Sequence, residues 1–190
     1  MNNHRLLKLT VLAVVTLLAV ALAVPWHSLA APALVPPVPG GPGFQMVNAF
    51  QFRSAWPSRT WDYFNGELFN PGPEDNFYEA AMSLPDNITI TGMVVYFYDN
   101  SAQDLVAALW RFDPATGDNL EMATVWSSDA QDQYRNLADT SIIEPVIDQQ
   151  RYSYVIEVGM LAGSYNTLRL AGVRIDYGYN SQLPIVEKNP

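Results

Sequence analysis

Cysteine is absent from the 190-residue chain, and histidine occurs only at His4 and His27. Without cysteine no disulfide can form, so the stability of the fold must come from a buried apolar core. Beyond residue 30 the chain has neither residue type, which excludes Ser-His-Asp and Cys-His nucleophile systems. It also excludes zinc and copper sites built from imidazole or thiolate ligands.

Phosphate-binding glycine loops, dinucleotide fingerprints and G-x-S-x-G elbows are also missing. Among common enzyme designs this leaves paired carboxylates, as in glycoside hydrolases. Glu157 and Asp176 both lie within predicted strands rather than turns, so they are the candidate pair for such an enzyme. The interpretation we favour is that they are solvated or pair with arginines across strands. We therefore expect a protein that is not an enzyme, with a carboxylate-based glycoside hydrolase as an alternative.

Positive charge is scarce after residue 30, where eight basic residues accompany nineteen acidic ones and the formal charge is −11. Binding to nucleic acid requires clustered lysine and arginine, so this composition argues against it. It argues in the same way against anionic membrane surfaces. We expect neither nucleic acid nor membrane as a partner of the folded part.

The N-terminal region has the pattern of a secretory signal peptide over residues 1–30. A short basic start is followed by an uncharged apolar run, residues 9–24, and then by the small residues Ser28 and Ala30. The run is shorter than the roughly 20 residues of a spanning helix, although a retained membrane anchor is the alternative. Residues 31–43 hold five prolines and three glycines, which predicts a linker. We expect secretion or display at the cell surface, with one domain over residues 44–188.

Short β-rich segments separated by turn clusters fill the rest of the chain, and helical periodicity is hard to find. This spacing predicts an all-β fold, an antiparallel β-sandwich that is jelly-roll-like and has about eight strands. Pro145 cannot donate to a ladder, so its strand is predicted at an edge. The predicted strands are residues 46–52, 77–83, 88–99, 105–112, 120–127, 142–147, 152–160 and 168–177.

Two of these segments, ITITGMVVYFYDN (residues 88–100) and LRLAGVRIDYGYN (residues 168–180), share an unusual pattern. In each, the apolar residues alternate in one phase before a glycine, Gly92 or Gly172, and in the opposite phase after it. A β-bulge at a glycine produces such a change of face within one strand. If the match is not coincidence, we expect the two strands to be neighbours or symmetric counterparts.

Aromatic residues crowd SAWPSRTWDYFNGELF, residues 54–69, which reads as an irregular segment. Exposed flat rings mark binding surfaces and can stack on sugar rings. The candidate carbohydrate-binding residues are Trp56, Trp61 and Tyr63, with Asp62 as a hydrogen-bonding partner for hydroxyls. The alternative is that these rings cap an open end of the sandwich.

Two turn clusters, DNSAQD and DPATGDN, offer oxygen ligands of the kind that calcium binds. Asp and Asn are also ordinary turn formers, and no EF-hand spacing is present, so we favour turns over a metal site. No other cofactor is predicted. The candidate calcium ligands are Asp99, Asn100, Asp104, Asp113 and Asp118.

The segment LPDNITITGMVVYFYDNSAQDLVAALWRF, residues 84–112, and LRLAGVRIDY near the C-terminus resemble a pattern of one family. It is a family of exported bacterial β-sandwich proteins without an established function, with the pattern LPDxxIT…VYFYDNS…LxR…LxxxVRIxY. Asn87 stands where that pattern usually has glycine. The resemblance implies a secreted β-sandwich and no particular activity, and it assigns no functional residues.

Together these features predict a secreted, non-catalytic β-sandwich that serves as a structural or interaction module of the cell envelope or the extracellular space. The alternative is a carbohydrate-binding module that uses the aromatic residues of the segment 54–69. The expected partner is a glycan or an envelope protein. Self-assembly is a further option, because the proline-rich segment could add a strand to the sheet edge of a neighbouring subunit.

Overall fold

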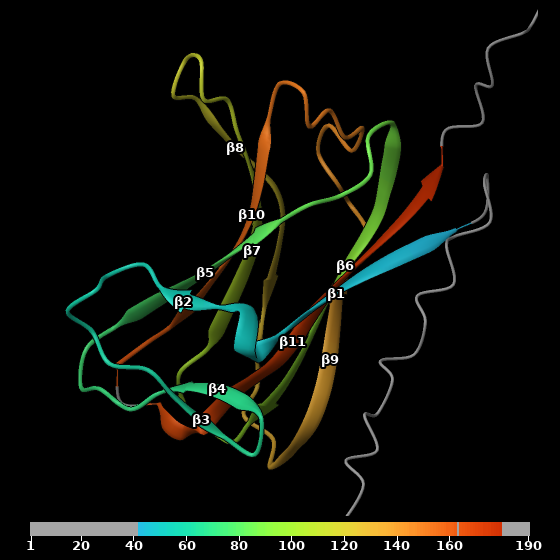
Figure 1. The fold of residues 1–190 in the computed structure, drawn as a ribbon. Coiled ribbons are helices and arrows are strands. Elements are labelled where there is room, and N and C mark those ends of the chain that lie inside the picture. The colour runs from blue at the N-terminus through green and yellow to red at the C-terminus, as the bar shows by residue number, and fades with distance from the viewer. Residues whose placement is uncertain (1–41, 163, 180–190) are drawn as a thin grey trace, which may run out of the picture. The chain divides into compact units, whose positions relative to one another are not determined.

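The computed structural model describes residues 42–162 and 164–179 (Figure 1). The predicted signal peptide, most of the predicted linker and the last predicted residues of the domain lie outside this part. Gly43, predicted in the linker, belongs to the first strand. Among the described residues, no helix has the length and apolar character needed to cross a membrane.

Eleven strands form two antiparallel sheets that share one apolar core (Figure 1). Sheet A has the order β3-β4-β11-β6-β9, with β1 also paired to β11, and sheet B has the order β2-β5-β10-β7-β8. The predicted antiparallel β-sandwich is therefore confirmed, with more strands than expected. The strands are β1 (Gly43–Asn48), β2 (Arg53–Ser54), β3 (Asp62–Phe64), β4 (Glu67–Asn70), β5 (Asn76–Met82), β6 (Ile88–Asp99), β7 (Leu105–Phe112), β8 (Asn119–Trp126), β9 (Gln133–Asp139), β10 (Ser153–Met160) and β11 (Tyr165–Tyr179), and a 3₁₀ turn, η1 (Ala49–Gln51), follows β1.

Alternation along the strands divides most side chains of sheet B between the core and the outward face, with one register shift between β7 and β8 at Leu109 and Trp110. In β10, Tyr154, Ile156 and Val158 are buried, whereas Val155 and Glu157 between them are only partly covered. Successive side chains of a strand point to opposite faces, so the apolar set fixes which residues face outward. The outward set of sheet B forms the candidate site described below.

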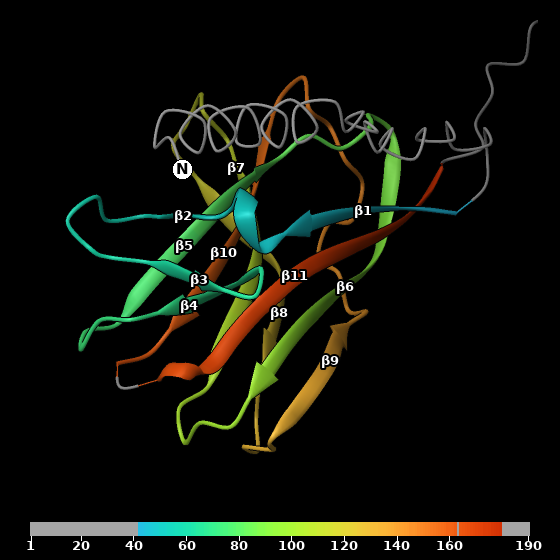
Figure 2. The same ribbon diagram turned by 60° about the horizontal axis from the view of Figure 1, so that its bottom comes forward.

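The pairing of β6 with β11 confirms the phase change predicted at the two glycines (Figure 2). The strands run antiparallel side by side, with one register shift between Leu170 and Gly172 of β11 and a second at the residues of β6 next to Gly92. Each shift inserts one extra residue, so the opposite set of side chains faces the core beyond it. Both strands thereby bury their apolar residues along their whole length.

The prediction of a strand over residues 142–147 is wrong. This segment is a loop that touches sheet A through one isolated bridge, Val146 with Thr89, and through a hydrogen bond from the Ile90 amide to the Pro145 carbonyl, 2.9 Å. Proline accepts hydrogen bonds but has no N–H to donate, so it cannot support a regular ladder. The segment therefore lies along the sheet without joining it.

Four strands, β2, β3, β4 and β9, were not predicted. β3 and β4 form a hairpin within the segment that we expected to be irregular. The turn consists of Asn65 and Gly66, both at positive φ (52° and 88°), which is the backbone geometry that an Asn-Gly pair favours between two strands. This Asn-Gly pair is therefore the signal for the hairpin that the sequence analysis overlooked.

The first prediction concerns the contact of β1 with the bulge in β11. A Cβ at Gly172 would lie 2.8 Å from the Val47 carbonyl oxygen of β1, so backbone would have to move. We expect Gly172→Ala to lower the free energy of unfolding by about 1–3 kcal/mol, measured by urea denaturation.

Gly178→Ala is the matched control in the same strand, because a Cβ there would meet nothing within 4 Å. Its effect should stay within about 0.5 kcal/mol. Equal effects of the two substitutions would contradict the importance of the close approach of β1.

Candidate functional site

The outward face of sheet B carries a row of large apolar side chains that crosses four strands. The register places Phe77 of β5 opposite Gly159 of β10, Gly159 opposite Val106 of β7, and Val106 opposite Trp126 of β8. A Cβ at Gly159 would lie 2.8 Å from Val106 and 3.0 Å from Phe77, so these side chains close over the glycine from both sides. The row is therefore continuous across β10.

Trp56, which follows the edge strand β2 in the chain, extends this row. Its ring meets the Phe77 ring edge to face, with centroids 5.4 Å apart, and the Arg59 guanidinium lies 4.2 Å from its centroid. Arg59 is in turn held by Glu74, at 3.1 Å. Trp56 is 40 % exposed and Trp126 is 55 % exposed, so an accessible indole ring lies at each end. We call Trp56, Phe77, Val106 and Trp126 the apolar row.

Three glutamates share the outward face with the apolar row. Glu79 of β5 lies directly opposite Glu157 of β10, and Glu121 of β8 lies opposite Trp110 of β7. A hollow of about 370 Å³ lies on this face, lined by Glu79, Trp110, Phe112, Asn119, Val155 and Glu157. We call the apolar row, the three glutamates and this hollow together the sheet B face.

The environment of Glu157 disfavours its charged form. Partial burial raises the pKa of this carboxyl above its ordinary value, and the charges of Glu79 and Glu121 raise it further. The indole N–H of Trp110 opposes this shift in the pKa. That N–H is buried and has no well-formed hydrogen bond to any described residue. The hollow therefore holds crowded negative charge and a donor that is poorly satisfied.

No described arginine forms an ion pair with these glutamates, although Arg53 of β2 lies directly opposite Glu79 in the register. Six arginines form ion pairs with other acidic residues. The remaining one in the described chain, Arg53, donates to the carbonyl oxygens of Phe50 and Phe52 at 2.7 and 2.8 Å. The negative charge of the sheet B face is therefore left without a partner in this part of the protein.

The outward face of sheet A is different, because its polar groups bind one another. Arg169 of β11 forms an ion pair with Glu67 of β4 at 3.2 Å, and both side chains are about nine-tenths buried. The Arg169 guanidinium lies 4.0 Å from the Tyr98 ring centroid, and the Tyr134 hydroxyl donates to Glu67. These groups form a closed network and offer little to a ligand.

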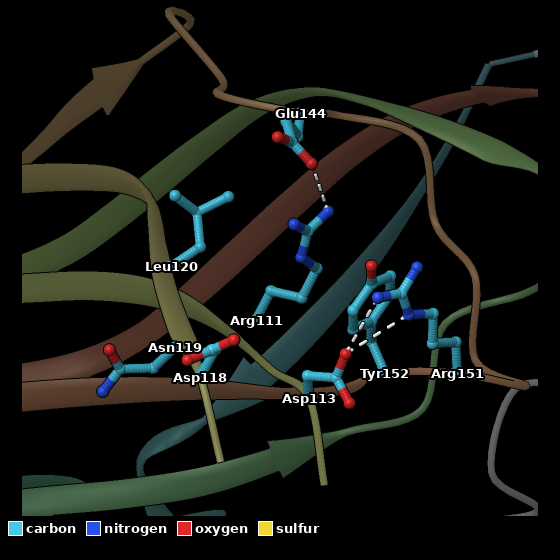
Figure 3. A pocket seen from close by; sticks show the side chains of 8 residues that line it. All are labelled: Arg111, Asp113, Asp118, Asn119, Leu120, Glu144, Arg151 and Tyr152. Atoms are coloured by element: carbon cyan, nitrogen blue, oxygen red, sulfur yellow. Dashed lines mark hydrogen bonds and ion pairs between the residues drawn. The ribbon is translucent and has the colours of Figure 1, made fainter. Parts of the chain in front are cut away.

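A second hollow, of about 270 Å³, lies beside the β7–β8 hairpin (Figure 3). Arg111 and Arg151 both lie against the Tyr152 ring, 4.2 and 4.7 Å from its centroid. Arg111 pairs with Glu144 at 2.6 Å, and Arg151 pairs with Asp113 at 3.1 Å, as the dashed lines in Figure 3 show. These pairs connect the hairpin to the following loop, which explains the cluster as a structural one.

The predicted carbohydrate-binding residues do not form one cluster. Trp56 belongs to the sheet B face, whereas Asp62 and Tyr63 lie in β3 of sheet A. Tyr63 is partly buried against the Phe50 ring, with centroids 4.8 Å apart. Trp61 is 37 % exposed and lies in the connection between β2 and β3. Of the four predicted residues, only Trp56 joins the site built by the register of sheet B.

The predicted pairing of Glu157 with Asp176 as acid and base is wrong. Glu157 lies in β10 of sheet B and Asp176 in β11 of sheet A, so the two belong to different sheets. Asp176 is ion-paired at 2.9 Å with Arg174, as the favoured interpretation expected, although Arg174 lies in the same strand rather than across from it. Glu157 has no such partner and is the member of the pair that remains of interest.

The candidate calcium ligands are also dispersed. Asp99 is fully buried and pairs with Arg135 at 3.2 Å, and Asp113 pairs with Arg151. Asn100 and Asp104 belong to the turn after β6, whereas Asp118 belongs to the β7–β8 turn. Across residues 42–162 and 164–179, no group of three or more His, Cys, Asp or Glu side chains is placed to hold a metal ion. The structure does not assemble the predicted site.

The sequence analysis missed Trp110, Phe112, Trp126, Glu79 and Glu121. A usable signal was present in β7, LVAALWRF, where simple alternation places Trp110 and Phe112 on the face opposite the buried leucines. Trp126 ends β8 in the same way, as an exposed residue after a buried one. The missed aromatic residues stand on strands, whereas the predicted ones were expected in an irregular segment.

Comparisons with known proteins give distant likenesses to solved structures. No family model and no curated protein matches the chain. The similar structures include Arthrobacter globiformis T6 isomalto-dextranase complexed with panose (TM-score 0.41, 10% identity, 70% of this chain and 23% of that one). They also include a Podospora anserina beta-(1,4)-mannanase (TM-score 0.40, 10% identity, 80% and 30%) and a low-affinity xylan-binding module from Roseburia intestinalis (TM-score 0.39, 14% identity, 71% and 96%). The chain spans less than a third of both enzymes, and likenesses at this level do not assign a function.

The second prediction concerns charge repulsion on the sheet B face. Because the pKa of Glu157 is raised in the folded protein, the folded state binds more protons than the unfolded state, and stability falls as pH rises through that raised value. We expect Glu157→Gln to stabilise the protein at pH 7 by about 0.5–1 kcal/mol, since like charges directly opposite each other destabilise a sheet.

The gain should vanish below the ordinary pKa of 4.5, where Glu157 is protonated in both states. Thermal or urea unfolding of the single variants Glu157→Gln and Glu79→Gln and of the double variant measures this effect. Either single substitution already removes the repulsion between Glu79 and Glu157. The double variant should therefore gain less stability than the sum of the gains of the two single variants. A loss of stability at pH 7 in Glu157→Gln would refute the repulsion.

Proposed function

We propose that the protein is a secreted, non-catalytic carbohydrate-binding protein whose ligand lies across the sheet B face. The observation that carries this proposal is the combination of exposed indole rings with carboxylates that lack ion-pair partners in the described chain. Flat rings stack on the C–H faces of sugars, and carboxylates accept hydrogen bonds from hydroxyls. Small-molecule sites commonly combine such apolar walls with a few polar groups.

The dimensions of the apolar row favour an extended chain over a single sugar. Phe77 and Trp126 are three strand spacings apart, which is about 14 Å, and Trp56 lies beyond Phe77. A ligand that runs across the strands would meet several of these side chains in succession. Each contact would be weak alone, and their sum would give the affinity.

The scaffold supports such a site because all of its residues except Trp56 stand on strands rather than on loops. β10 and β7 are flanked on both sides by hydrogen-bonded neighbours, and β10 supplies Glu157 while β7 supplies Trp110 and Val106. Side chains on paired strands lose little freedom on binding, so a preformed surface costs less to occupy.

A glycoside hydrolase is the second candidate, favoured by one observation. Glu79 and Glu157 are directly opposite, so their Cβ atoms are about 4.5–5.5 Å apart, and the pKa of Glu157 is raised as in a general acid. Release of reducing ends from a bound glycan, lost in Glu157→Gln, would favour the hydrolase. Binding without turnover favours the non-catalytic proposal.

The third prediction tests the location of the site. A glycan array first identifies a bound glycan, and calorimetry then measures its affinity for variants. We expect Trp126→Ala to weaken binding by about 2 kcal/mol, roughly thirtyfold in Kd, because an exposed ring at the end of the apolar row is lost.

Phe44→Ala is the matched control, since Phe44 is 62 % exposed and belongs to β1 of sheet A. The affinity of the Phe44→Ala variant for the glycan should equal that of the unaltered protein. If Trp61→Ala abolishes binding while Trp126→Ala does not, the ligand binds at the β2–β3 connection and the sheet B face is not the site.

A further inference from the structure

The sheet B face is negatively charged and its charge is not balanced within the described chain. We propose that the carbohydrate it binds carries protonated amines, as in a polysaccharide of amino sugars with free amino groups. This inference rests on the proposed function and names the chemical class of the ligand. It follows from the arrangement of the three glutamates around exposed rings.

The first step is the distribution of counter-charges. Six described arginines form ion pairs with acidic residues elsewhere, as Arg135 does with Asp99 and Arg169 with Glu67. The glutamates of the sheet B face form no such ion pair among the described residues, although Glu79 and Glu157 lie directly opposite each other. Like charges opposite each other cost stability, so a face that keeps them is suited to a positively charged partner.

The second step is the position of these charges relative to the rings. Glu157 and Glu79 line the same hollow as Trp110 and Phe112, and Glu121 lies opposite Trp110. An ammonium group has three N–H donors and no acceptor, which matches carboxylates that only accept. Indole rings attract the same cation through their faces. The hollow therefore combines both kinds of group that recognise an amine on a flat, partly apolar body.

The third step compares ligand classes. A neutral glycan would bring hydroxyl donors to the rings but leave the charge of Glu79, Glu121 and Glu157 unbalanced. An anionic glycan would be repelled by all three. A glycan with free amines satisfies the rings and the carboxylates together, and its charge-assisted hydrogen bonds are the stronger kind.

The experiment compares one sugar backbone with and without charge. Calorimetry at pH 6 measures the binding of the purified protein to chitin oligosaccharides, which are N-acetylated and neutral, and to the same oligosaccharides after removal of the acetyl groups. We expect the de-N-acetylated form to bind at least about tenfold more tightly. The double variant Glu79→Gln/Glu157→Gln should lose this preference, so that it binds the two forms with equal affinity.

Asp86→Asn/Asp148→Asn is the charge-matched control. It also removes two negative charges, outside the sheet B face, and the amide keeps the side-chain oxygen that accepts from backbone amides in both places. It should retain the preference. Thermal unfolding confirms that each variant is folded, and glutamine preserves the size of glutamate.

Each other outcome has a defined meaning. Equal affinity for the two oligosaccharides, or an equal loss in the control variant, overturns the inference and leaves the proposed function standing. If neither oligosaccharide binds but the glycan array identifies another bound glycan, the inference is wrong and the proposed function still stands. If no glycan binds at all, the proposed function fails. If oligolysine binds as tightly as the amino sugar and Trp126→Ala has no effect, the partner is a basic protein, and both are overturned.

Discussion

The antiparallel pairing of β6 with β11 is the interaction on which the rest of the sandwich depends. β11 holds β6 along one edge, and β4 and β1 along the two halves of the other, so most of sheet A is assembled on this strand. Without the two bulges, one half of each strand would turn its apolar residues to solvent. The bulge at Gly172 also admits the backbone of β1, so it connects the burial of the core to the entry of the chain into the sheet.

The two outward faces differ in how their charged side chains are satisfied. Sheet A buries the Arg169–Glu67 pair under tyrosines and satisfies its charges internally. Sheet B keeps Glu79 and Glu157 side by side and leaves indole rings exposed, which are departures from what stability alone would favour. Local conflicts of this kind in an otherwise consistent fold are expected at functional sites. These departures are the reason for placing the proposed site on sheet B rather than on sheet A.

Much of the fold could be predicted from the sequence, because strands such as β6 and β7 carry strong apolar alternation between clear turns. The glycine-linked phase change even indicated which two strands are related. The weakly apolar β9 and the Asn65-Gly66 hairpin were missed, and the proline-containing segment was assigned a strand that it cannot complete. The site was harder to predict, because Glu157, Glu79 and Trp126 come from three strands whose order follows only from the register. Alternation shows that each of them faces outward, but it cannot show that they share one surface.

Gly159 has a consequence for the length of ligand that the face can accept. Phe77 and Val106 meet over Gly159, so the apolar row crosses β10 without a side chain from that strand. A larger residue at this position would project between Phe77 and Val106. It would divide the apolar row into two parts, one with Trp56 and one with Trp126. In the proposed binding site, this single backbone position therefore decides whether a polymer could lie across the whole apolar row or only on one half of it.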